Sequence, residues 1–380
     1  MKIVLGFFLL LVGYVAYAQH ADEIHKKAIV LDMHNDVLSA FIMSGKDIAK
    51  PIARGHTDLP RLKKGGVDVQ FFSVWCDGKK KEPFAYANKQ IDALYGLIKR
   101  NDADIMLGTN IDAIEMGIAK GKLVAMIGVE GGHMIDNRLD YIDSLYKRGV
   151  RYLTLTWNNS TNWASSAADE SKKTTKHRGL SHLRKEVIVR MNRLGMMIDL
   201  SHVGEQTFYD VLSTTTKPVI ASHSDVYTIS PHYRNLKDAQ IRAIAKNKGV
   251  IGVNFYTDFL DPAYRKRVSL LYSKYVNKED TMKLTVDKKF NLLPLKAKEE
   301  LRPSLSLIVD HINYIVNLAG VDCVGLGADF DGMESTPVNM DDVADYPNLT
   351  KALLTCGYSE QDIYKILGGN VLRVIEAQQN

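Results

Sequence analysis

Five short polar motifs in this chain carry residue types that could do chemistry. They are His34-Asn35-Asp36, Glu130-Gly131-Gly132, Ser201-His202, Ser222-His223 and Asp329-Phe330-Asp331-Gly332. Together they offer three imidazoles and at least three carboxylates, a mixture of donors that zinc and other borderline metals favour. A lone histidine after a strand is more often structural, so the prediction of a metal site rests on all five motifs meeting in one place.

Two of the candidate ligands have a further rationale in their local sequence. In an extended segment, side chains two residues apart point to the same side, so His34 and Asp36 could hold one ion together. Glu130 follows the apolar run LVAMIGV, where an ionised carboxylate needs partners. Two cations that share Glu130 would supply those partners.

A second His-x-Asp motif, His56-Thr57-Asp58, serves as an internal control. A Leu-Pro pair and then a Gly-Gly pair follow it, so we expect Asp58 to cap a short helix, and we interpret this motif as structural. His133 lies close to Glu130 in the sequence and fits either a supporting or a structural role. We do not expect five other histidines to be ligands, namely His20, His25, His177, His182 and His311.

Each of the five motifs follows or ends an apolar run of strand length. There are eight such runs, at residues 29–31, 69–75, 123–129, 152–157, 196–200, 218–221, 250–255 and 323–326. Several are continuously apolar, as parallel strands buried on both faces are, and helix-like patterns such as that of residues 85–99 separate them. The alternation predicts a closed (β/α)8 TIM-type barrel, whose active site lies at the carboxyl ends of the strands. An open, doubly wound sheet is the alternative.

The stretch between the seventh and eighth predicted strands is unusually long. Residues 257–322 exceed the length of an ordinary crossover and are rich in lysine and tyrosine. We expect this segment to form extra helices on the rim of the barrel, where they would shape or cover the site.

The composition is that of a globular protein. Of the 380 residues, 46% are hydrophobic and 24% are charged, and the formal net charge is only +5. No basic cluster is interleaved with aromatic residues, so nucleic acid is not an expected partner. The three cysteines are too few for a disulfide scaffold. Cys76 and Cys323 should lie at opposite ends of the barrel and should not be bridged.

The first residues have the pattern of an export signal. A basic start at Lys2, an apolar run over residues 3–15 and the sequence Ala16-Tyr17-Ala18 predict a signal peptide of residues 1–18. The apolar run is shorter than the roughly 20 residues of a membrane span. The expected mature chain, residues 19–380, is a single catalytic domain without a membrane span, located in the periplasm or outside the cell.

In their order and spacing, these motifs resemble those of the membrane (renal) dipeptidase family of binuclear zinc peptidases. The resemblance runs from LDMHNDVL through GVEGGHMID, GMMIDLSHVGE, PVIASHSDVY, HYRNLKD and VGLGADFDG to GGNVLRV, and so covers essentially the whole mature chain. It implies a zinc-dependent dipeptidase, and it also implies a possible homodimer. By the resemblance, a hydroxide held between two Zn²⁺ ions per chain would attack the scissile carbonyl.

The same resemblance assigns roles to individual residues. His34 and Asp36 would bind one zinc, His202 and His223 the other, and Glu130 would bridge both. Asp329 corresponds to the acid/base residue, and Arg234 corresponds to the arginine that holds the terminal carboxylate of the substrate. Asp331 is interpreted as structural.

One position departs from the family pattern. The family commonly has a histidine after the fourth strand, thought to contact the substrate carbonyl, and Trp157 stands there in this chain. We expect Trp157 to line the substrate site and to favour an apolar side chain. Two other functions remain open: another binuclear amidohydrolase activity, such as deacylation of N-acyl amino acids, and a non-catalytic peptide-binding role.

Overall fold

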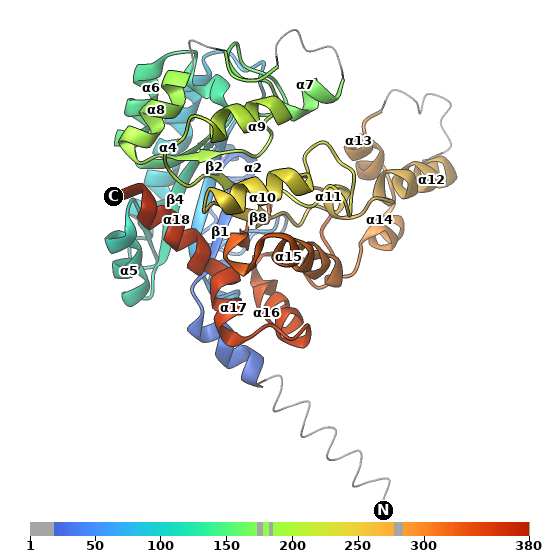
Figure 1. The fold of residues 1–380 in the computed structure, drawn as a ribbon. Coiled ribbons are helices and arrows are strands. Elements are labelled where there is room, and N and C mark those ends of the chain that lie inside the picture. The colour runs from blue at the N-terminus through green and yellow to red at the C-terminus, as the bar shows by residue number, and fades with distance from the viewer. Residues whose placement is uncertain (1–18, 173–177, 182–184, 277–283, 380) are drawn as a thin grey trace, which may run out of the picture.

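A closed barrel of parallel strands forms the centre of the protein (Figure 1). The computed structural model describes residues 19–172, 178–181, 185–276 and 284–379. Eight strands form the barrel, and pairing between β2 and β4 closes it. These strands are β1 (Val30–Asn35), β2 (Val67–Trp75), β4 (Leu123–Glu130), β5 (Val150–Thr154), β6 (Met197–Asp199), β7 (Ile220–Ala221), β8 (Val250–Val253) and β9 (Val324–Leu326). Each strand overlaps one of the eight predicted runs, which confirms the (β/α)8 barrel over the open sheet.

A further strand, β3 (Ile105–Leu107), was not predicted. It pairs with residues 123–125 of β4, whereas β5 pairs with residues 127–130 of the same strand. Because β2 occupies the other edge of β4, β3 fills the edge left free near the amino ends of the strands. Three residues are too few to distinguish a strand from a loop by their pattern.

The helices surround the barrel (Figure 1). Those that follow the strands in the first two thirds of the chain are α2 (Val37–Ala40), α3 (Leu59–Lys64), α4 (Pro83–Arg100), α5 (Ile111–Ala119), α6 (Leu139–Lys147), α7 (Ala167–Ser171), α8 (Lys185–Leu194), α9 (Glu205–Leu212) and α10 (Asp238–Lys246). Towards the carboxyl end come α15 (Ser306–Ala319), α16 (Tyr346–Thr355), α17 (Glu360–Tyr364) and α18 (Asn370–Gln379). Apolar side chains of α18 join the interior of the barrel, so this helix closes the end opposite the polar motifs.

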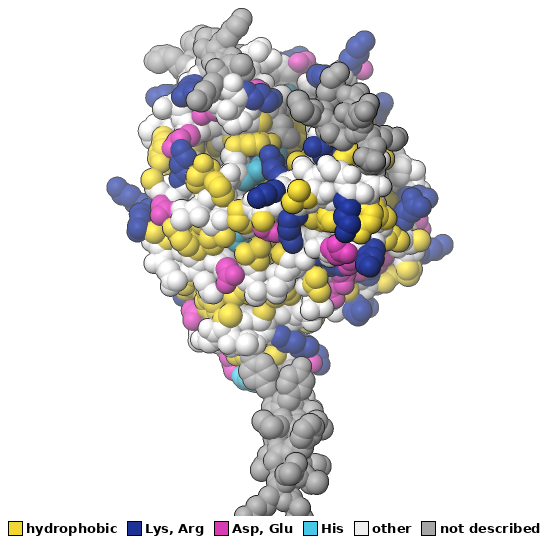
Figure 2. Space-filling model, turned by 90° about the vertical axis from the view of Figure 1, so that its right-hand side faces the viewer, with side chains coloured by type: hydrophobic (Ala, Val, Ile, Leu, Met, Phe, Trp, Pro, Cys, Tyr) yellow, Lys and Arg dark blue, Asp and Glu magenta, His cyan; other side chains and the backbone are white. Residues whose placement is uncertain are grey.

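The segment between β8 and β9 forms an excursion from the barrel, as expected. It contains α11 (Thr257–Leu260), α12 (Tyr264–Val276), α13 (Val286–Asn291) and α14 (Leu295–Leu301). Helices α12 to α14 pack around an apolar cluster of their own, which includes Tyr264, Tyr272 and Phe290. Figure 2 views the molecule from the side on which these helices lie, and lysine and arginine side chains are scattered there among apolar ones.

The interior of the barrel depends on a local irregularity in β1. Asp32 and Asn35 of β1 pair with Gln70 and Phe72 of β2, so β1 carries one residue more than its partner between these pairs. Such a bulge re-aims side chains. As a result, Met33 packs in the apolar interior while the next residue, His34, also faces inward.

The remaining structural predictions can be checked directly. The Asp58 carboxylate accepts a hydrogen bond from the Arg61 backbone N–H and caps α3, so the interpretation of the control motif is confirmed.

Cys76 and Cys323 are free, as expected, and lie beyond opposite ends of their strands. Among the described helices, none is long and apolar enough to cross a membrane. His177 and His182 lie outside the described residues.

Candidate metal centre

The six side chains expected at the site converge above the carboxyl ends of the strands. His34 lies within β1 and Asp36 follows it, Glu130 ends β4, and His202, His223 and Asp329 lie two or three residues beyond β6, β7 and β9. All six are buried, with exposed fractions between 0% and 9%. Parallel strands deliver their carboxyl ends to one edge, which is why residues so far apart in the sequence meet here.

Glu130 lies between two groups of donors, and each of its oxygens faces one of them. Its Oε2 is 3.6 Å from His34 Nε2, which is in turn 3.7 Å from Asp36 Oδ2. Its Oε1 is 2.8 Å from His202 Nε2 and 3.7 Å from His223 Nε2. A carboxylate placed in this way can bridge two ions.

The unsatisfied atoms at the site test whether metal would fit. His34 Nε2 and Asp36 Oδ1 are buried and have no hydrogen-bond partner among the described residues. The Nε2 atoms of His202 and His223 lie only 3.0 Å apart. Buried polar atoms are rarely left unpaired, and two imidazole nitrogens that each bind a metal would present lone pairs here. The donor atoms of His34, Glu130 and His223 lie within 4.8 Å of one another, and so do those of His34, Asp36 and Asp329.

Each histidine is oriented through its second ring nitrogen. His34 Nδ1 lies 2.9 Å from the Tyr152 hydroxyl, and His223 Nδ1 lies 2.8 Å from Ser222 Oγ. His202 Nδ1 lies 3.3 Å from Asn158 Oδ1. Such contacts fix the tautomer, so that Nε2 is the metal-facing atom.

Burial sets the protonation of two of the three imidazoles, whereas at His34 burial is outweighed by Tyr152 and Glu130 and the pKa is raised. Burial lowers the pKa of His202 to about 4, and the Arg234 cation adds to this effect. Burial also lowers the pKa of His223 well below its usual value, helped by the neighbouring His34. Both rings are therefore neutral at physiological pH, the form in which imidazole binds a metal.

Burial acts on the carboxyl groups in the opposite direction. It raises the pKa of Asp329 to about 7, and the carboxylates of Asp36 and Glu130 add to the shift. At Glu130, by contrast, burial is outweighed by the adjacent His34 and His202, and the pKa is lowered. Glu130 is thus an anion, whereas the raised pKa of Asp329 favours uptake of a proton by its carboxylate.

Backbone strain accompanies this arrangement. His202 has φ of 65° and Asp329 has φ of 68°, so both lie in the left-handed region that favours glycine. Each such residue costs on the order of 1–3 kcal/mol and persists only where its surroundings hold it in place. Asn254 supplies part of that support, because its Nδ2 donates to Asp329 Oδ2 at 3.0 Å.

Comparison with known proteins agrees with this geometry. The family model described as membrane dipeptidase (peptidase family M19) matches residues 18–380. An uncharacterized dipeptidase of Schizosaccharomyces pombe is 34% identical over 377 residues, covering 94% of this chain and 82% of the relative. The chain belongs to the membrane dipeptidase family. It is therefore a dipeptidase, an enzyme of a metallopeptidase family that hydrolyses peptide bonds.

Solved structures show the same fold. The probable dipeptidase PvdM from Pseudomonas aeruginosa superposes with a TM-score of 0.80 at 24% identity, covering 96% of this chain and 98% of the other. A metallopeptidase from Rhodobacter sphaeroides, liganded with a phosphinate mimic of the dipeptide L-Ala-D-Ala, gives a TM-score of 0.74 at 22% identity, covering 93% of this chain and 100% of the other.

A cavity of about 690 Å³ opens above the candidate metal ligands of this dipeptidase. Asp36, Glu130, His202, His223 and Asp329 line its floor, and both other expected site residues, Trp157 and Arg234, line its sides. The half-buried Trp157 ring lies 5.1 Å from the ring of Trp75. Residues 284–287 of the excursion complete the wall, so this segment shapes the site.

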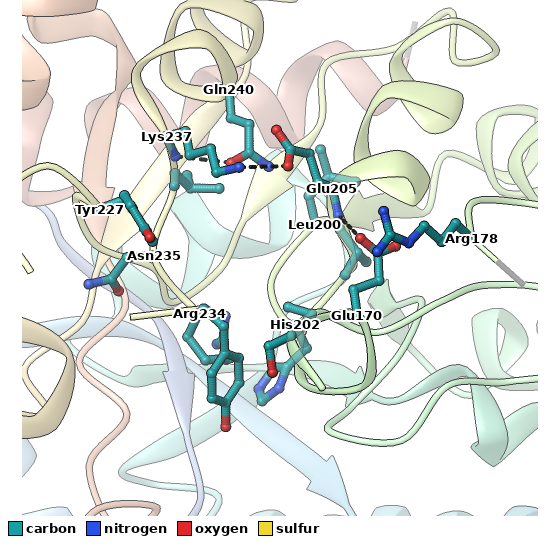
Figure 3. Close-up of a pocket in the computed structure, with 15 residues that line it drawn as sticks. Glu170, Arg178, Leu200, His202, Glu205, Tyr227, Arg234, Asn235, Lys237 and Gln240 are labelled. Carbon is teal, nitrogen blue, oxygen red and sulfur yellow. Dashed lines mark hydrogen bonds and ion pairs between the residues drawn. The ribbon is translucent and has the colours of Figure 1, made fainter. Parts of the chain in front are cut away.

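Arg234 is almost fully buried and only partly paired. Its Nη2 donates to the His223 carbonyl at 2.9 Å, whereas its Nε has no partner among the described residues. Together with His202, it also borders a second hollow of about 280 Å³ (Figure 3). On the far side of that hollow, Lys237 Nζ pairs with Glu205 Oε2 at 2.7 Å.

Several other histidines make hydrogen bonds that anchor them within the fold. His56 Nδ1 accepts a hydrogen bond from the Asp331 backbone N–H at 3.1 Å, and the His56 backbone N–H donates to Asp331 Oδ1 at 2.6 Å. These two hydrogen bonds fix the side chains of both residues. His133 Nε2 lies 3.0 Å from the Cys76 carbonyl. His311 bonds to backbone groups of Val226 and Leu260.

Proposed function

We propose that this protein is a zinc-dependent dipeptidase that binds two Zn²⁺ ions per chain. His34 and Asp36 would hold one ion, His202 and His223 the other, and Glu130 both. The observation that carries the proposal is the position of Glu130, whose Oε2 faces His34 and whose Oε1 faces the other two histidines. Such a pair of ions supplies a polarised carbonyl and a water activated near neutral pH.

The side chains of the protein would supply the remaining functions. Asp329 would take up a proton from the attacking water and pass it to the leaving amine, which its position beside His34 and its pKa of about 7 support. Arg234 would bind the terminal carboxylate of the substrate, because its free Nε leaves part of the guanidinium unused. Trp157 would offer an apolar surface to the substrate.

Metal analysis of purified protein tests the two-ion site. We expect about two zinc ions per chain, and we expect loss of hydrolysis when a chelator removes them. His34→Ala should lose one ion, whereas His56→Ala, in the control motif, should retain both. A fully active protein with one ion or none would contradict the bridged site.

A further inference from the structure

The wall of the substrate cavity away from the metal ligands carries a pair of carboxyl groups. Asp287 comes from α13 of the excursion and Glu334 from the loop after β9, and both line the cavity. The Tyr256 hydroxyl donates to Asp287 Oδ1 at 2.7 Å and also lies near the carboxyl group of Glu334. A single hydroxyl proton can satisfy only one of the two carboxylates at a time.

This pair has no counter-charge within the part of the chain that the structure describes. Two arginines line the cavity. Arg265 forms an ion pair with Asp258, to which its Nε and Nη2 both donate. The other, Arg234, bonds to the His223 carbonyl. No described lysine, arginine or histidine lies within 4.0 Å of Asp287 or Glu334. Burial and the neighbouring Asp287 raise the pKa of Glu334 to about 7, as expected where negative charge is uncompensated.

A continuous surface connects these carboxyl groups with the buried Arg234. The Arg234 guanidinium carbon lies 5.4 Å from the centre of the Phe259 ring, and that ring lies 5.0 Å from the ring of Tyr256. The Nε of Arg234, a residue only 3% exposed, has no partner among the described residues and is free to bind the substrate as proposed above. A substrate bound at Arg234 can therefore extend a side chain along Phe259 and Tyr256 to the two carboxyl groups.

A metal ion is a less suitable occupant of this wall than an organic cation. Groups of three or more potential ligands occur among the described residues only at the centre around His34. The ammonium or guanidinium of a substrate side chain needs fewer oxygens, and charge-assisted hydrogen bonds to a carboxylate are among the strongest available in proteins.

We propose that Asp287 and Glu334 form a subsite for a positively charged side chain, so that the enzyme prefers dipeptides that contain lysine or arginine. The inference rests on the proposed function, in which Arg234 and the metal centre hold the dipeptide in this cavity. It adds a cationic preference at one residue of the substrate to the apolar surface that Trp157 offers.

Matched dipeptides test the subsite. Lysine and norleucine have the same straight chain and differ in the terminal ammonium, so Lys-Ala is compared with norleucine-Ala, and Ala-Lys with Ala-norleucine. In one of the two pairs we expect kcat/KM for the lysine dipeptide to be about 10-fold higher or more, the value of one charge-assisted contact. The Asp287→Asn/Glu334→Gln double variant should bring that ratio close to one and leave norleucine hydrolysis nearly unchanged.

The control variant is Glu300→Gln, which removes an exposed carboxylate from α14 of the same excursion and should leave the ratio as in the wild type. Zinc content and circular dichroism of the double variant verify that it folds. The subsite is refuted if the wild type favours lysine at neither position, or if the double variant keeps the preference. In both cases, continued hydrolysis of the norleucine dipeptides leaves the proposed function intact. If the metal-replete enzyme hydrolyses none of the four, the proposed function itself fails.

Discussion

Asp329 lies beside the proposed metal ligands, in a buried environment that raises the pKa of its carboxyl group. Its Oδ1 lies 3.8 Å from His34 Nε2, and Asn254 holds its other oxygen at 3.0 Å. Asp329→Asn keeps the shape of the side chain but cannot accept the proton. We expect kcat to fall by about 10²–10⁴-fold while both metal ions remain, as measured by steady-state kinetics and elemental analysis of the same preparation.

Trp157 should behave differently, because it offers a surface and no titrating group. Trp157→Ala removes contacts that ground state and transition state share, so KM should rise more than kcat falls. Comparison of the two variants on one dipeptide separates the roles. A large loss of kcat in Trp157→Ala together with a mild effect of Asp329→Asn would show that the roles are reversed.

At the residue scale, the sequence allowed prediction of the residues with distinctive chemistry but not of those that orient them. His34, Glu130 and His223 could be found because imidazoles and carboxylates recur at five strand ends, a coincidence that structural roles alone do not explain. Tyr152 was interpreted as part of an apolar strand, and its hydroxyl contact with His34 had no signal in the pattern. The contact of Asn158 Oδ1 with His202 Nδ1, at 3.3 Å, likewise had no signal in the sequence.

At the scale of elements, strand positions were predictable and strand ends were not. Residues 152–157 were expected to form one strand, whereas β5 spans Val150–Thr154. The β1 bulge depends on pairing with β2, a contact between segments distant in sequence, and period-two patterns do not reveal it. The short β3 has the same explanation, because only its contact with β4 makes it a strand.

Close packing inside the barrel makes Gly128 of β4 sensitive to substitution. A Cβ atom there would lie 1.9 Å from the ring of Tyr152, which is buried and cannot easily move. We expect Gly128→Ala to reduce the free energy of unfolding by about 1–3 kcal/mol and to weaken zinc binding through the displaced Tyr152–His34 contact. Denaturant unfolding and zinc titration measure the two effects.

Gly96 within α4 is the matched control. A Cβ atom there would meet only the end of the Arg100 side chain, at 3.1 Å, and alanine favours a helix by about 0.8–1.0 kcal/mol over glycine. Gly96→Ala should therefore leave zinc binding unchanged and should not destabilise the protein. If Gly128→Ala and the wild type are equally stable, the side chains inside the barrel, Tyr152 among them, can shift to accommodate the added methyl group.

At the scale of the whole molecule, export is the prediction that can be tested most simply. We propose that residues 1–18 are removed and that the mature chain begins at Gln19. Intact-mass measurement of protein recovered from the native cell envelope or medium should give the mass of residues 19–380. A chain that retains Met1 in those fractions would contradict cleavage at this position.

The barrel architecture was predictable because apolar runs of strand length and helix-like patterns alternate along the whole chain. Eight apolar runs separated by helical patterns admit few arrangements, and a barrel places all their carboxyl ends together. The excursion between β8 and β9 was expected from its length alone. Its contribution of residues 284–287 to the cavity wall needed the structure, since no sequence pattern fixes how a rim segment folds over a site.

The separate apolar cluster of α12 to α14 has a consequence for how such enzymes diverge. Its members, among them Tyr264, Tyr272 and Phe290, belong to neither of the two clusters that hold the barrel. Mutations can therefore accumulate and be compensated within the excursion without any change in the packing around the strands. The part of the cavity wall that contacts the substrate can therefore change in sequence while the proposed metal ligands stay the same. Related enzymes can in this way differ in the peptides that they cleave and keep the same catalytic residues.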